Sequence, residues 1–114
     1  PDGVLWIPAY ASGSLLRYDP AADRFTRHAL PIADAAPYVV KVDAARGAIW
    51  IGTSSADALF RFTPADGSMD TYLLPSRGAL VRHLEVDSRD GSVWLAYGAS
   101  PGIASRVARV VPAD

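Results

Sequence analysis

Three tryptophans stand 44 residues apart in this chain, at Trp6, Trp50 and Trp94. Each lies in the same local phrase: a glycine, one further residue, an aliphatic residue, tryptophan, and then isoleucine or leucine. A fixed period in the forties, built from short apolar runs, is typical of the blades of a β-propeller. The spacing therefore predicts an all-β chain, folded as a β-propeller segment of four-stranded antiparallel blades.

The periodicity extends well beyond the tryptophans. In the third copy it resumes after a four-residue insertion near Ser100-Pro101-Gly102. Because so many matches share one register, they define the repeat strongly. A shift of 44, or 48 after the insertion, superimposes Arg17 on Arg61 and Arg109, Pro20 on Pro64, Leu30-Pro31 on Leu74-Pro75, and Val42-Asp43 on Val86-Asp87.

The middle copy is complete and shows four β-rich runs separated by turn residues. Its expected strands cover 38–43, 48–53, 59–63 and 69–74, with a tight turn at 45–47.

The same phasing divides the chain, a part of a single β-propeller domain, into blade fragments. The first lacks its innermost strand and the third lacks its outermost strand, so we expect ten strands in groups of three, four and three, or about two and a half blades. The fragments are 1–31, 32–75 and 76–114.

A closed propeller needs four to eight blades, so this chain is not expected to close a ring alone. The missing blades would come either from further chain or from self-association. The sequence favours further chain, because the carboxyl end lacks a fourth strand while the amino end lacks a first strand.

Composition excludes several function classes. The net charge is −1 with both signs interspersed, so there is no basic stripe for a nucleic acid. No apolar run is long enough to span a membrane. The absence of cysteine excludes disulfides and thiolate metal sites, and fits either the periplasm or the cytoplasm.

The repeated phrases resemble those of the virginiamycin B lyase family, whose streptogramin lyase-like propellers belong to a broader NHL-like group. The phrases are Gly-x-Val/Ile-Trp-Ile/Leu, Leu-x-Arg-Tyr/Phe-x-Pro and Tyr-x-Leu-Pro. The resemblance implies that a cyclic depsipeptide lactone is opened by elimination near the central channel. It also implies a magnesium ion held by glutamates, a histidine as acid or base, and a periplasmic or secreted location, with the cytoplasm as the alternative.

One histidine matches the family pattern. His83 lies eleven residues before Trp94, the place of the family's catalytic histidine. The places of the metal-binding glutamates hold Val81 and Tyr97, which supply no carboxylate. We therefore expect no cofactor in this segment, with magnesium possible in the complete propeller from blades outside it.

Four further residues are candidate ligand-binding groups for a small molecule. Arg82 and Arg77 lie near His83 and could hold an anionic group; the structural alternative for Arg77 is a solvated loop charge. Tyr38 and Tyr97 recur near the channel end of their strands, where aromatic residues either line pockets or pack between blades. His83 itself has the alternative of a structural residue in an alternating strand.

The remaining repeated residues predict structure rather than chemistry. The three tryptophans are expected to be buried equivalently between blades. The repeated arginines are expected to pair with backbone carbonyls or with aspartates such as Asp43 or Asp87, and His28 is expected to be exposed on an outer strand.

Two functions from different classes remain open. One is a lyase or hydrolase with its site at the central channel. The other is a catalytically silent propeller that binds a ligand or a protein. Whether the chain is an enzyme is left undecided by these residues, because the metal-binding glutamates are not in this segment.

Overall fold

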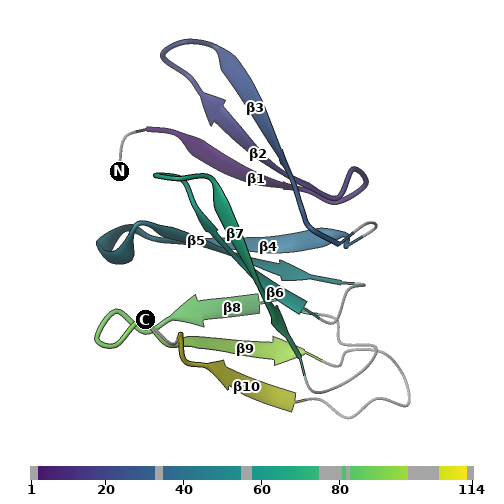
Figure 1. Cartoon of the computed structure of the whole chain (residues 1–114), viewed down its shortest axis with the longest axis vertical. Helices are drawn as coiled ribbons and strands as arrows, with labels where there is room; N and C mark the ends of the chain where they lie inside the picture. The colour runs from purple at the N-terminus through teal and green to yellow at the C-terminus, as the bar shows by residue number, and fades with distance from the viewer. Residues whose placement is uncertain are drawn as a thin grey trace.

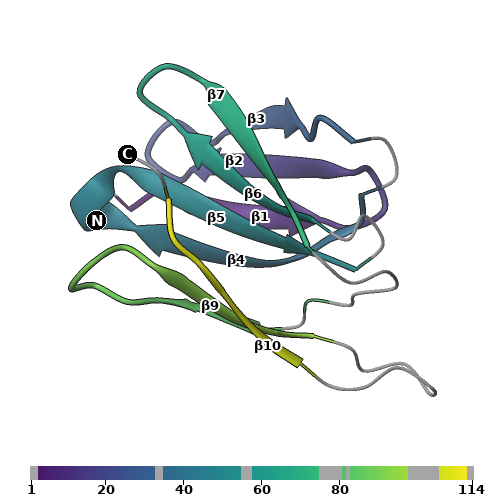
Figure 2. The same cartoon turned by 60° about the horizontal axis from the view of Figure 1, so that its bottom comes forward.

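The computed structural model of the chain describes residues 3–32, 35–54, 58–74, 81, 83–97 and 106–112. Within these residues, ten strands form three antiparallel sheets of three, four and three strands (Figure 1). The sheets lie one beside the next in chain order, as Figure 2 also shows from another side. The predicted all-β propeller segment, with its grouping of ten strands, is therefore confirmed.

We call the three sheets blade 1, blade 2 and blade 3. In each, consecutive strands pair as a meander. Blade 1 contains β1 (Leu5–Ala9), β2 (Ser14–Asp19) and β3 (Arg24–Ala29); blade 2 contains β4 (Pro37–Asp43), β5 (Ala48–Thr53), β6 (Ala58–Thr63) and β7 (Ser68–Leu73); blade 3 contains β8 (His83–Val86), β9 (Val93–Tyr97) and β10 (Arg106–Val110).

The strands of blade 2 begin and end within one residue of the expected positions. The turn predicted at 45–47 is instead a single turn of 3-10 helix, η1 (Ala44–Arg46). Gly47 ends it with φ of 60°, a left-handed conformation that glycine adopts without steric cost. The chain reverses there as expected, so the repeat assignment holds.

Neighbouring blades are held together by side chains that alternate along each strand. Successive residues of a strand point to opposite faces of its sheet. In β5, Ile49 and Ile51 pack toward blade 1, in a cluster with Leu15 and Phe60. Trp50 packs toward blade 3. We call the face of a blade that carries its tryptophan the following face, and the opposite one the preceding face.

The expectation that all three tryptophans are buried is wrong for Trp94. Trp50 is 1% exposed because blade 3 covers it with Leu84, Val93 and Leu95. Trp6 is half-buried against blade 2, with its ring 5.7 Å from that of Phe62. Trp94 occupies the same place in blade 3 but is 46% exposed. The described residues provide no blade on its following face.

The repeated arginines lie beside the tryptophans. Arg61 is the cross-strand partner of Trp50, with its guanidinium carbon 5.8 Å from the ring centre. Arg109 has the same relation to Trp94, at 5.5 Å. Such cation–π contacts are worth about 0.5–1 kcal/mol at exposed sites.

Each of these two arginines binds an aspartate, as the repeat predicts. Arg61 binds Asp70 on the adjacent strand, with Nη2 to Oδ2 at 2.8 Å, and Arg109 binds Asp90 at 2.9 Å. Both arginines therefore pair with an aspartate, as predicted, through Asp70 and Asp90, and the charge of Arg109 also acts on Asp87. For Arg61 the physical reason is strand register: Asp70 lies directly opposite it.

His28 is half-buried rather than exposed. Its ring centre lies 4.5 Å from that of Phe62, because β3 presents this residue to the contact between blades 1 and 2. No helix among the described residues has the length and hydropathy needed to cross a membrane.

Candidate functional site

The innermost strands of blades 2 and 3, β4 and β8, lie next to each other. Each occupies the edge of its sheet. His83 is the first residue of β8 and Tyr38 is the second residue of β4, so both stand where an inner strand begins. We call this the His83 end of the blades. β5 and β9 finish at the same end, because they run antiparallel to β4 and β8.

Three ionisable side chains meet along these inner strands. Lys41 Nζ lies 2.9 Å from Glu85 Oε1, joining blade 2 to blade 3. His83 Nε2 lies 3.7 Å from the same carboxylate oxygen. All three side chains keep access to solvent: Lys41 is 41% exposed, Glu85 58% and His83 68%. A small molecule could therefore reach the imidazole directly.

The carboxylate is the electrostatic centre of this group. The Lys41 ammonium lowers the pKa of Glu85 by hydrogen bonding and by its positive charge, and His83 lowers it further. Glu85 is thus ionised at neutral pH.

A pair of aromatic side chains, from blades 1 and 2, lies at the same end. The Tyr38 ring packs edge to face against Tyr10, with ring centres 6.4 Å apart. Tyr10 follows β1 and is 56% exposed, and Tyr38 is 49% exposed. Two exposed phenol rings from different blades form a surface suited to the flat apolar face of a ligand.

The other predicted ligand-binding residues are placed only in part. Tyr97 is the last residue of β9, directly after Ala96, which pairs with His83. Arg77, Arg82 and the Tyr97 side chain lie outside the described residues. The convergence of His83, Arg82 and Tyr97 therefore stays a prediction.

Sequence reasoning missed Lys41 and Glu85. The two residues are separated by 44 and so occupy equivalent places in blades 2 and 3. Comparing charges at equivalent inner-strand positions could have identified the pair, because such positions come close together near the axis of a propeller.

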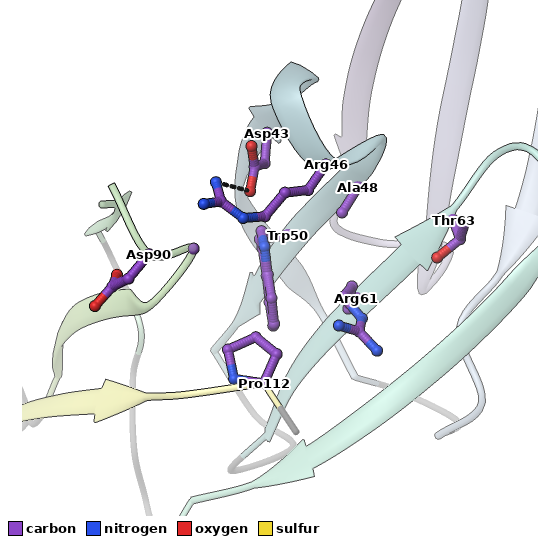
Figure 3. Close-up of a pocket in the computed structure, with 9 residues that line it drawn as sticks. Asp43, Arg46, Ala48, Trp50, Arg61, Thr63, Asp90 and Pro112 are labelled. Atoms are coloured by element: carbon purple, nitrogen blue, oxygen red, sulfur yellow. Dashed lines mark hydrogen bonds and ion pairs between the residues drawn. The ribbon is translucent and has the colours of Figure 1, made fainter. Parts of the chain in front are cut away.

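A pocket of about 430 Å³ lies at the opposite end of the blades, between blades 2 and 3 (Figure 3). Its walls include Asp43 at the end of β4 and Asp90 in the turn before β9. Arg46 crosses from one blade to the other: it binds Asp43 at 3.5 Å and the carbonyl oxygen of Ser88 at 3.3 Å. Gly91 makes room for it, since a Cβ there would lie 2.5 Å from Arg46 Nε.

The charged groups of this pocket already have partners within the chain. Arg61 is bound to Asp70, and Asp90 to Arg109 and Ser92. Trp50 lines the pocket but is almost fully buried. These contacts assign the pocket to blade-to-blade packing, and the His83 end remains the candidate site.

The described residues at the His83 end do not fit a magnesium site. Val81, at one of the places implied for a glutamate, is fully buried and apolar. Glu85 is the carboxylate beside His83, and it is engaged by the Lys41 ammonium, which repels a cation. No group of three histidine, cysteine, aspartate or glutamate side chains able to hold a metal ion occurs in the described parts of the chain. Mg²⁺ prefers several oxygen ligands, which these residues do not supply, so we assign no part of a reaction at this end to magnesium.

The fold matches solved propeller structures. A streptogramin B lyase structure superposes with a TM-score of 0.75 at 21% identity, over 98% of this chain and 38% of that one. The virginiamycin B lyase of Staphylococcus aureus gives 0.74 at 23% identity, over 98% and 39%. The extracellular domain of BT4673 from B. thetaiotaomicron, a candidate one-component system, gives 0.64 at 20% identity, over 90% and 14%.

These comparisons confirm the likeness to the lyase propellers at the level of fold. The chain spans less than two-fifths of the length of the lyases it matches. No family model and no curated protein sequence matches it.

Proposed function

We propose that the His83 end of blades 2 and 3 forms part of the wall of a ligand-binding site in the central channel of a complete propeller, and that His83 transfers protons there if the protein is an enzyme. The observation that carries this proposal is the meeting of Lys41, His83 and Glu85 across two neighbouring inner strands. Away from this end, the charged side chains discussed above lie in turns or pair within their own blade.

The chemistry of the three groups supports proton transfer. An imidazole can act as a general base or as a general acid, because one ring nitrogen accepts a proton and the protonated ring donates one. Glu85 stabilises the imidazolium that forms, while Lys41 keeps Glu85 ionised. Tyr38 and Tyr10 add an apolar surface at the same end of the blades. The ligand that fits is a small molecule with both a polar group and a flat apolar part.

A streptogramin lyase-like activity is the enzymatic form of the proposal, and likeness of fold to two lyases supports it. In an elimination that opens a lactone, His83 would remove a proton from carbon while the carboxylate leaves. Carboxylates for a metal ion would have to come from other blades.

A catalytically silent, ligand- or protein-binding propeller is the alternative. The valine at position 81 and the tyrosine at position 97 favour it, since His83 is the one described histidine at this end and the described residues contain no metal-binding set. Both forms place the ligand at the same end of the blades.

The test uses the longest natural chain that carries these blades, with streptogramin B as the probe. We expect His83→Ala to lower turnover by about 10²-fold or more. His28→Gln, at the second histidine, serves as the control and should retain activity. Mass spectrometry separates elimination, which leaves the mass unchanged, from hydrolysis, which adds a water.

Calorimetry on the same proteins measures binding. If the unaltered protein binds streptogramin B without converting it, and Lys41→Met and His83→Ala weaken that binding, the catalytically silent propeller is favoured. Full turnover in His83→Ala, or binding indifferent to both variants, would refute the proposed site.

An exported location is part of the proposal, supported by the match to an extracellular domain. Fractionation of the native host with an antibody to this chain would test it; recovery in the cytoplasm alone would contradict it.

A further inference from the structure

The inner strand of blade 3, β8, belongs to a different sheet from β4, so no ladder of backbone hydrogen bonds fixes one strand against the other. The charges that the two strands carry nevertheless meet closely, with Lys41 Nζ 2.9 Å from Glu85 Oε1. The placement of β8 must therefore come from side chains between the blades and from the chain that flanks the strand. One such contact lies directly before His83.

Val81 precedes His83 by two residues and is held by blade 2 in two ways. Its backbone N–H donates a hydrogen bond to the carbonyl oxygen of Thr53, at 3.0 Å. Its side chain is fully buried in the cluster that contains Trp50 and Leu59 of blade 2. The chain is thus fixed to blade 2 at the point where it enters blade 3.

The space that Val81 fills exists because residue 52 is glycine. A Cβ at Gly52 would lie 2.6 Å from Cγ1 of Val81 and 3.2 Å from its Cβ. Val39 of β4 borders the same space, with its Cγ1 also 2.6 Å from that point. Val81 therefore packs where β4 and β5 meet, and a sideways movement would either open a void or force a clash.

The hydrogen-bond acceptor for Val81 is itself held in place. Thr53 is fully buried at the end of β5, and its Oγ1 donates a hydrogen bond to the carbonyl oxygen of Ala58, at 2.8 Å. Threonine and valine are both β-branched and stiff about χ1, so neither side chain adapts easily to a shift. Since one residue separates Val81 from His83, a movement of Val81 would be passed on to the first residue of β8.

We propose that Val81 is a positioning residue for the candidate site. Packed against Gly52 and bound to Thr53, it sets where β8 lies against β4, and it thereby keeps Glu85 and His83 within reach of Lys41. The site it serves rests on the function proposed above, whereas the placement of the three charged groups can be measured without a ligand.

The test is an NMR titration of Glu85 in the longest natural chain that carries these blades. Glu85 is the one glutamate of the 114 residues, which helps to assign its signal in glutamate-labelled protein. The Lys41 ammonium lowers the pKa of Glu85, so the rise in that pKa caused by Lys41→Met reports how closely the two charges lie. His83 also acts on Glu85, and it is present in every protein compared.

The rise should shrink by about half or more when Lys41→Met is made in a Val81→Ala protein. The reason is that Coulomb attraction falls by about half when the separation of two charges doubles, and the direct hydrogen bond is lost as well. Gly52→Ala, which crowds the same space from the other side, should reduce the rise in the same way.

Two controls separate positioning from a general loss of stability. Val81→Thr keeps the branched shape but buries a hydroxyl in an apolar contact, so it should unfold at lower urea and still show the full rise in the Glu85 pKa. Val40→Ala removes the same two methyl groups on the side of β4 that packs toward blade 1, and should also show the full rise.

A full rise in both Val81→Ala and Gly52→Ala would overturn the proposal. An equal reduction in Val81→Thr and Val40→Ala would also overturn it, because Val81 would then be an ordinary core residue. A failure of the function proposed for His83 would change neither result, since no ligand enters the measurement.

Discussion

Replacing Gly52 with alanine should destabilise the contact between blades 2 and 3. A Cβ at this position would lie 2.6 Å from Cγ1 of Val39 and 2.6 Å from Cγ1 of Val81. Carbon atoms pack at about 3.5–4.0 Å, so both valines would have to move by about 1 Å. Valine is stiff about χ1, which makes such a movement difficult without a shift of the backbone.

Overpacking of this kind costs about 1–3 kcal/mol. Removing a glycine from a strand returns roughly 0.5–1 kcal/mol. We therefore expect Gly52→Ala to lower the free energy of unfolding by about 1–2 kcal/mol. Urea denaturation followed by tryptophan fluorescence measures this, because Trp50 is buried in the same contact.

The repeat supplies a matched control. Ala96 is equivalent to Gly52 but lies exposed on the open face of blade 3. Ala96→Val should change the free energy of unfolding by less than about 0.5 kcal/mol. Adding Val81→Ala to Gly52→Ala should cost less than the sum of the two single changes, since it removes one of the clashes. A Gly52→Ala protein as stable as wild type would refute this account of blade spacing.

Two further predictions concern the tryptophans and the inner-strand ion pair. Trp50→Ala should lower the free energy of unfolding by about 3–5 kcal/mol. Trp94→Ala should lower it by less than half as much, measured by urea denaturation of the dilute protein. Equal losses in the two variants would contradict the difference in burial between these tryptophans. Lys41→Met should raise the pKa of Glu85 toward its ordinary value in an NMR titration. Because the folded-state pKa is lowered, the pair stabilises the fold above the ordinary carboxyl pKa and loses this effect as the pH falls through the lowered value. An unchanged Glu85 titration would show that Lys41 is not its partner.

The sequence predicted the strands well because a repeat constrains them three times over. Turn residues such as Gly47 recur at the same phase in every copy, so strand bounds in blade 2 follow within one residue. Burial was less predictable. Trp50 and Trp94 have the same local phrase, and their exposure differs because burial depends on the neighbouring blade and not on the phrase.

Contacts between blades were the least predictable part of the candidate site. His83 was found from its spacing to Trp94, and it does begin an inner strand. Its neighbours Lys41 and Glu85 were missed because their approach depends on how two sheets are placed side by side. The sequence predicted aspartate partners for Arg61 and Arg109 but did not identify Asp70, which lies opposite Arg61 through cross-strand register.

The opposite charges of Lys41 and Glu85 restrict how such a propeller can arise by duplication. These residues occupy one position of the repeat, and neighbouring copies of that position come within an ion-pair distance of 2.9 Å. A ring made from copies of blade 2 would place lysine beside lysine, and one made from blade 3 would place glutamate beside glutamate. Like charges at that range repel. At this position, therefore, the two blades are not interchangeable: the lysine of blade 2 is complementary to the glutamate of blade 3.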